Sequence, residues 1–66
     1  MKIILNGSPR DVPNNLSVSE LILSLGLADK RLALEINREI VPRSSFESHV
    51  IHPDDKVEIV HAIGGG

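Results

Sequence analysis

Apolar and polar residues alternate along this chain in short segments. Residues 2–5 are mainly apolar and β-branched, and Asn6-Gly7 separates them from a second strand-like stretch, residues 8–12. Asn-Gly is favoured in two-residue hairpin turns because both turn positions need a positive φ. We therefore predict a hairpin at the start of the chain. Pro9 has no N–H to donate, which favours an edge position for the second strand.

The next segment has the pattern of a helix start. Residues 17–20 read Ser-Val-Ser-Glu, the capping-box pattern in which the cap and the third helical residue satisfy each other's backbone N–H groups. Leu16 and Leu21 are spaced as the accompanying hydrophobic staple, and Gly26 is a natural left-handed stop. The pattern predicts an amphipathic helix of about two to three turns. Its apolar stripe comprises Val18, Leu21, Ile22 and Leu25.

Three further strands are indicated in the second half of the chain. Residues 31–37 alternate, with Leu32, Leu34 and Ile36 on one side, and residues 39–41 form a short strand that ends at Pro42. Residues 43–55 are polar and irregular, with Phe46, Val50 and Ile51 as expected anchors. Asp54-Asp55 marks a turn into a final strand over residues 57–63.

One helix between two strand pairs covers only one face of a sheet. The arrangement that buries every apolar stripe is an α+β fold, a mixed five-stranded sheet with the helix packed across one face. This is the β-grasp, or ubiquitin-like, layout, with the first and last strands parallel in the centre and the proline-bearing strands at the edges. The expected core comprises Ile3, Leu5, Val12, Leu21, Ile22, Leu25, Leu32, Leu34, Ile36, Val57 and Ile59.

The same strand phase predicts an apolar patch on the open face of the sheet. If Ile3 and Ile59 point inward, then Ile4, Val60 and also Ala33 face outward, near Ile63. A partner could dock on this patch. The alternative is that scattered exposed apolar residues are normal and have no function.

Composition restricts the chemistry of the chain. It has 66 residues, no cysteine and a net charge of −2, and Phe46 is its only aromatic residue. A basic face or stacking platform for nucleic acid is therefore not expected. Any role in sulfur transfer cannot use a cysteine persulfide on this chain. With no long apolar segment, we expect a soluble, cytoplasmic protein that does not enter membranes. We also expect the free protein to be a monomer.

The chain ends in Gly64, Gly65 and Gly66. Glycine lies extended in channels too narrow for other residues, so these glycines give access to the Gly66 carboxylate. Counted from Ala62, five residues span up to roughly 17 Å, enough to enter another protein's active site. We therefore expect a β-grasp domain over residues 1–61 and a flexible tail over residues 62–66. The alternative is a frayed terminus without a function.

Three stretches together resemble the ThiS-type sulfur carriers of thiamine biosynthesis. They are the opening Ile3-Ile4-Leu5-Asn6-Gly7, the central segment over residues 35–43 (Glu-Ile-Asn-Arg-Glu-Ile-Val-Pro-Arg) and the close over residues 57–66. The resemblance implies that an adenylating (ThiF-type) enzyme uses ATP and Mg²⁺ to convert the Gly66 carboxylate into an acyl adenylate. It implies that a sulfur-donor persulfide protein then supplies the sulfur of a thiocarboxylate, which thiazole synthase (ThiG-type) consumes. No cofactor is expected on the chain itself.

Parts of the sequence also fit other functions. The glycine end alone also fits a molybdopterin-type sulfur carrier or a ubiquitin-like protein modifier, and a plain interaction module with an inert tail is a third possibility. We expect no catalytic residue in the chain. His49 and His52 have a His-x-x-His spacing but no third strong ligand, so we expect no metal site, and Asp54 or Asp55 is expected to cap a turn. His61, near the tail, could influence partner binding.

Overall fold

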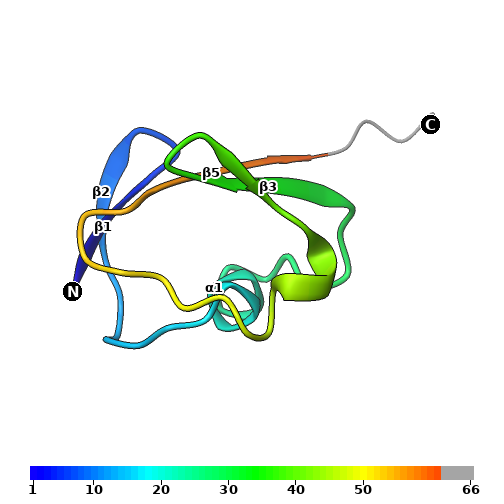
Figure 1. Ribbon diagram of the computed structural model, residues 1–66, viewed down its shortest axis with the longest axis horizontal. Coiled ribbons are helices and arrows are strands. Elements are labelled where there is room, and N and C mark those ends of the chain that lie inside the picture. The colour runs from blue at the N-terminus through cyan, green and yellow to red at the C-terminus, as the bar shows by residue number, and fades with distance from the viewer. Residues whose placement is uncertain (62–66) are drawn as a thin grey trace.

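The computed structural model describes residues 1–61, and the predicted tail lies outside them. It has a five-stranded sheet in the order β2-β1-β5-β3-β4 and one α-helix. Figure 1 shows the sheet as one layer, with α1 below it on a single face. The elements are β1 (Lys2–Leu5), β2 (Ser8–Asp11), α1 (Val18–Ser24), β3 (Leu32–Ile36), β4 (Glu39–Val41), the 3₁₀ helix η1 (Arg43–Ser45) and β5 (Lys56–His61). The predicted β-grasp fold is confirmed.

The strand order confirms the positions expected from the prolines. β2, which contains Pro9, and β4, which Pro42 follows, are the two edge strands. β1 and β5 are parallel neighbours inside the sheet, as predicted. The first hairpin turns at Asn6 and Gly7, with φ of 48° and 84°, which confirms the left-handed turn that the Asn-Gly pair predicts. Residues 62 and 63 of the predicted last strand lie outside the described residues.

The helix begins at the predicted capping box. The Ser17 hydroxyl accepts a hydrogen bond from the Glu20 N–H at 3.1 Å, and the Glu20 carboxylate accepts one from the Ser17 N–H at 2.9 Å. The bond from the Ser17 backbone N–H to the carboxylate, and after it the Ser17 side chain, lower the pKa of Glu20. The helix ends with Leu25 as its C-cap, and Gly26 follows in the left-handed region at φ 73°. The cap, the helix and its stop are thus as the pattern predicts.

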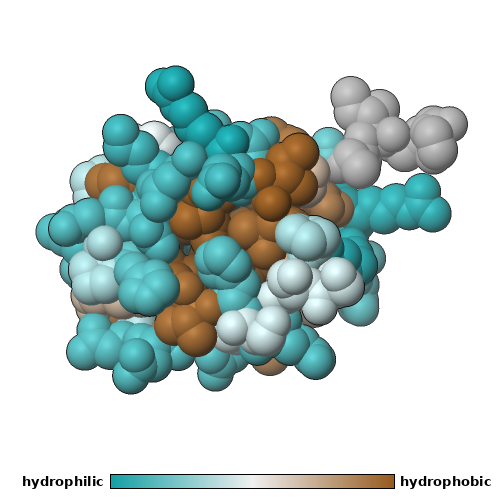
Figure 2. Space-filling view, in the orientation of Figure 1, coloured by the Kyte–Doolittle hydropathy of each residue, from teal (hydrophilic) through white to brown (hydrophobic). Residues whose placement is uncertain are grey.

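The core lies between the sheet and α1, where Figure 2 shows apolar side chains bordered by hydrophilic ones. Seven predicted core residues are buried, namely Ile3, Leu21, Ile22, Leu34, Ile36, Val57 and Ile59. The prediction of full burial is wrong for Leu5, Val12, Leu25 and Leu32, which are partly buried against the core. Each lies at or just beyond the end of its element, where fewer neighbours cover it. Their places in the core are taken by Leu16, Val18, Val41 and Ile51.

The segment between β4 and β5 corrects one further expectation. Ile51 is 1% exposed and Phe46 packs against the core, as expected of anchors, but Val50 is 39% exposed. The backbone of Val50 forms an isolated antiparallel bridge with Ser17. Neighbouring side chains of an extended chain point to opposite sides, so burial of Ile51 turns Val50 outward. Among the described residues, no helix is long and apolar enough to cross a lipid bilayer.

Candidate functional site

The predicted tail follows β5, an interior strand of the sheet (Figure 1). β5 pairs in parallel with β1 and antiparallel with β3, and its Val57 and Ile59 are 0% and 7% exposed. β1 pairs with β5 only at Lys56 and Val57, whereas β3 pairs with it as far as His61, so β3 holds the end of β5 that the predicted tail follows. Gly64, Gly65 and Gly66, together with Ile63, lie outside the described residues, so their roles stay predictions.

Asn6 adds a contact to β5 that the sequence pattern did not reveal. Its side-chain Oδ1 accepts a hydrogen bond from the Ile59 N–H at 2.8 Å, and its own N–H donates to the Val57 carbonyl at 2.9 Å. The pairing of β1 with β5 therefore continues through the hairpin turn. The sequence indicated only the turn role of Asn6, since a contact over 53 residues leaves no local signal.

The structure separates the residues of the predicted docking patch. Val60 is 60% exposed and lies directly opposite Ala33, which is also exposed. Ile4 lies opposite Lys56, four residues before Val60 on β5. At about 3.3 Å per residue, this offset is about 13 Å along the strand. Val60 and Ala33 therefore lie together near the start of the tail, and Ile4 lies apart from them and is only partly exposed.

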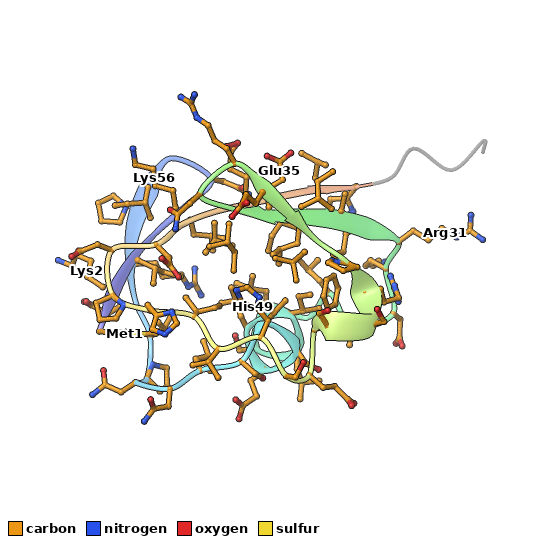
Figure 3. All side chains as sticks on the ribbon, viewed as in Figure 1. Met1, Lys2, Arg31, Glu35, His49 and Lys56 are labelled. Atoms are coloured by element: carbon orange, nitrogen blue, oxygen red, sulfur yellow. The ribbon has the colours of Figure 1, made fainter. Side chains whose placement is uncertain are left out.

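A second row of side chains, exposed at Glu58 and Ile40 and half-buried at Glu35, adjoins Val60 and Ala33. Glu35 of β3 lies opposite Glu58 of β5 on one side and opposite Ile40 of β4 on the other. Figure 3 shows Glu35 on the side of the sheet away from the helix. Ile40 is 72% exposed. Strand alternation places all of these side chains on the open face, and we call this set the sheet-face patch: Ala33, Glu35, Ile40, Glu58 and Val60.

The sheet-face patch has two carboxylates between apolar side chains. Like charges directly opposite each other on a sheet are destabilising. Among the described residues, no lysine or arginine lies within ion-pair distance of Glu35 or Glu58. The alternation of β3 and β5 could have indicated both glutamates, but their cross-strand pairing depends on a register that the sequence does not reveal.

The histidines of the His-x-x-His pair make structural contacts. The His52 backbone N–H donates to Asp55 Oδ2 at 2.8 Å, and Asn37 Nδ2 donates to Asp55 Oδ1 at 3.0 Å, so Asp55 holds a turn as expected. His52 Nδ1 lies 4.0 Å from Asp55 Oδ2. Within residues 1–61, no three His, Asp or Glu side chains are grouped as metal ligands. His61 is exposed and lies opposite Leu32.

Known proteins match this chain along its whole length. A sequence model of the ThiS family matches residues 3–66. The sulfur carrier protein ThiS of Escherichia coli K12 is 30% identical, and the match covers 100% of both chains. A crystal structure of the thiamine biosynthesis protein ThiS from Geobacter metallireducens is 32% identical with a TM-score of 0.88, again over 100% of both chains.

A longer protein matches as well. Thiazole synthase of Magnetococcus marinus is 39% identical over 66 residues, which is 100% of this chain and 20% of that protein. The chain thus spans about a fifth of that relative's length. The family match over almost the whole chain, the full-length relative and the structural agreement lead to one conclusion: the chain belongs to the ThiS family, the sulfur carrier proteins of thiamine biosynthesis.

Proposed function

We propose that this chain carries sulfur as a thiocarboxylate on Gly66 and donates it for thiazole formation in thiamine biosynthesis. The observation that carries the proposal is the sequence Gly64-Gly65-Gly66, which begins three residues after the end of β5, a strand in the interior of the sheet. A partner enzyme can thus bind the folded domain next to β5 while its active site receives the glycines and the Gly66 carboxylate. The name of the full-length relative, sulfur carrier protein, supports the same reading.

The first chemical step is activation of the Gly66 carboxylate. At neutral pH a terminal carboxylate is ionised, with an ordinary pKa near 3.3–3.7, and is a poor electrophile. A carboxylate oxygen attacks the α-phosphorus of ATP, the bond to pyrophosphate breaks, and an acyl adenylate forms. ATP and Mg²⁺ are substrates of the adenylating enzyme and are not bound by this chain alone.

The second step replaces oxygen by sulfur. The terminal sulfur of a protein persulfide attacks the acyl carbon, and AMP leaves with the electron pair of the broken C–O bond. A thiol then attacks the other sulfur of the resulting acyl disulfide, so that a disulfide forms and the thiocarboxylate leaves. The chain has no cysteine, so the persulfide and the thiol come from partner proteins.

The sheet-face patch is the surface we propose for the adenylating enzyme. An extended five-residue segment reaches at most roughly 17 Å beyond β5, so the enzyme must contact the body near His61. Val60 and Ala33 lie there, beside Glu35 and Glu58. An active site that binds a triphosphate and a carboxylate is electropositive, and the two glutamates complement such surroundings.

The name of the longer relative supports a thiazole synthase as the acceptor enzyme. In that protein a segment like this chain belongs to the same polypeptide as the rest of a thiazole synthase. Tethered sulfur has a high local concentration at the acceptor, which free sulfide lacks.

The proposal is tested by adenylation of the chain in ATP–pyrophosphate exchange with the ThiF-type enzyme of the source organism. The unmodified chain should support exchange. A variant extended beyond Gly66 should not, because its terminal glycine carboxylate has become an amide. Gly65→Ala should slow the exchange, since the added Cβ conflicts with a narrow channel. Equal exchange by the extended variant would contradict the proposal.

A further inference from the structure

Asn6 has the sequence neighbour that most favours chemical loss of an asparagine amide. Asparagine is a thermolabile residue, because the backbone nitrogen of the following residue can attack its side-chain amide carbon. Of the four asparagines in the chain, only Asn6 precedes a glycine, which has no Cβ to hinder that attack. Asn6 is also exposed, so water reaches the product of the attack. Deamidation of this chain is therefore expected first at Asn6.

The fold restrains the amide that would react. Asn6 Oδ1 accepts a hydrogen bond from the Ile59 N–H at 2.8 Å, and the Asn6 N–H donates to the Val57 carbonyl at 2.9 Å. The turn backbone is left-handed at both positions, with φ 48° at Asn6 and 84° at Gly7. Ring closure needs the amide to rotate until its carbon faces the Gly7 nitrogen, which breaks the bond to Ile59. β5 therefore holds the reacting group away from the reaction.

The β3–β4 turn offers a comparison within the same molecule. Asn37 and Arg38 form a second left-handed turn, with φ of 51° and 70°. Asn37 Oδ1 accepts from the Lys56 N–H at 3.0 Å, and the Asn37 N–H donates to the Lys56 carbonyl at 2.8 Å. An asparagine turn thus hydrogen-bonds β5 from each of its two neighbouring strands. The two turns differ in the residue that follows the asparagine, which is glycine in one and arginine in the other.

The Asn6 bond extends the contact between β1 and β5. β1 pairs with β5 at Lys56 and Val57, and the bond to Ile59 follows two residues later. β3, by contrast, pairs with β5 as far as His61. Among the described residues, Asn6 is the last one on the β1 side to hydrogen-bond β5 before the predicted tail. Loss of its bond would leave the end of β5 attached to β3 alone.

We propose that Asn6 is a deamidation site that β5 keeps unreactive, and that its conversion to isoaspartate releases β5 from β1. In the first step the Gly7 backbone nitrogen attacks Asn6 Cγ. The bond from Cγ to the amide nitrogen breaks, and ammonia leaves with that electron pair and the proton of the Gly7 N–H. Water then opens the resulting succinimide at one of its two carbonyl carbons.

The two products affect β5 differently. Opening at the Cγ carbonyl gives aspartate, which keeps an oxygen that can accept from the Ile59 N–H. Opening at the backbone carbonyl gives isoaspartate, in which the main chain runs through the former side chain and is one carbon longer. This changes the two-residue turn that pairs Leu5 with Ser8 and removes the acceptor from its place opposite Ile59. Isoaspartate formation thus loosens the strand that leads to the predicted tail.

The test incubates the full chain at neutral pH, folded and in denaturing guanidinium chloride, and locates by fragmentation the mass gain for exchange of NH₂ for OH. Asn6 should react in the denatured chain. It should react roughly tenfold or more slowly in the folded chain, because the bond to Ile59 and the turn must open first. Asn15 is the control in the same molecule, since it is exposed and has φ 60° but precedes Leu16. It should react far more slowly than Asn6 in the denatured chain.

A variant and a product analysis complete the test. Arg38→Gly gives Asn37 a following glycine, so Asn37 should then react like Asn6 in the denatured chain and again more slowly when folded. The isolated isoaspartate form should melt at a lower temperature than both Asn6→Asp and the unmodified chain. An unreactive Asn6 or an unreactive Asn37 in denatured Arg38→Gly would overturn the assignment of the site. Equal rates in folded and denatured chains would overturn protection by β5, and an unchanged melting temperature of the isoaspartate form would overturn the release of β5.

Discussion

Removal of the Asn6 side chain should loosen the strand that leads to the tail. Asn6 has two roles, since its Oδ1 accepts from the Ile59 N–H at 2.8 Å and its backbone adopts φ 48° in the hairpin turn. Asn6→Gly removes the bond and keeps the turn, because glycine adopts positive φ freely. Asn6→Ala removes the bond and also strains the turn. The two substitutions therefore separate the contact from the conformation.

The magnitudes follow from these two roles. A typical hydrogen bond contributes about 0.5–1.5 kcal/mol, and an unpaired buried N–H costs about 1–3 kcal/mol. Ile59 is 7% exposed, so its N–H stays largely buried when the bond is lost. We therefore expect Asn6→Gly to lower the free energy of unfolding by about 1–2 kcal/mol. The left-handed conformation of a non-glycine residue adds about 1 kcal/mol for Asn6→Ala. A chain of 66 residues has a total unfolding free energy of about 3–10 kcal/mol, so either loss is measurable.

Thermal unfolding monitored by circular dichroism, with urea titration, measures both variants. Each kcal/mol lowers the melting temperature by about 4–8 °C in a domain of this size. Gly7→Ala is the matched control for strain alone: Gly7 has φ 84°, and an added Cβ meets no atom within 4 Å. Its cost should equal the difference between the two Asn6 variants. If Asn6→Gly and the unmodified protein have the same melting temperature, the Asn6 bond does not stabilise β5 and the reasoning is refuted.

Three further predictions concern single side chains. Because the pKa of Glu20 is lowered by folding, the stability that its charge contributes is present above the ordinary glutamate pKa and is lost as the pH falls through the folded value. Urea midpoints across this acidic range should therefore fall less for Glu20→Gln, which can still bond to Ser17; an identical fall would contradict this. Arg38→Gly should raise the free energy of unfolding by about 1 kcal/mol, since Arg38 has φ 70°, and a lower value in a urea titration would show that the arginine side chain stabilises the turn. Glu58→Gln should raise the stability of the free protein by about 0.2–1 kcal/mol at low salt and less at high salt, because it removes the repulsion with Glu35; no salt dependence would count against a direct repulsion.

Local patterns predicted the elements of this fold well. The capping box at Ser17, the Asn-Gly turn and the two edge prolines each act over a few residues, so their signals are complete in the sequence. Burial at element ends was less predictable. Leu25 and Leu32 have the right spacing for the core, but only the tertiary structure shows that both are partly buried and that Leu32 lines an open groove between α1 and η1.

Features that depend on strand register or on long-range contacts could not be predicted from the sequence. Strand phase was correct, so Val60 and Ala33 were rightly placed on the open face, but the offset between parallel β1 and β5 separates Ile4 from them. The opposition of Glu35 to Glu58 and the position of Arg43 on Phe46 also depend on three-dimensional packing. The role of Gly66 was predicted from its residue type and its position in the sequence alone. That role must therefore be tested by a reaction at its carboxylate.

The central claim is that Gly66 is loaded with sulfur, and intact-mass spectrometry tests it most directly. The chain is incubated with the adenylating enzyme of its source organism, ATP, Mg²⁺, a persulfide donor and a thiol. The account predicts a mass gain equal to the exchange of one oxygen for sulfur, located at Gly66 by fragmentation and absent without ATP. An unchanged mass, or ligation of the chain to lysines of other proteins in place of that exchange, would contradict it.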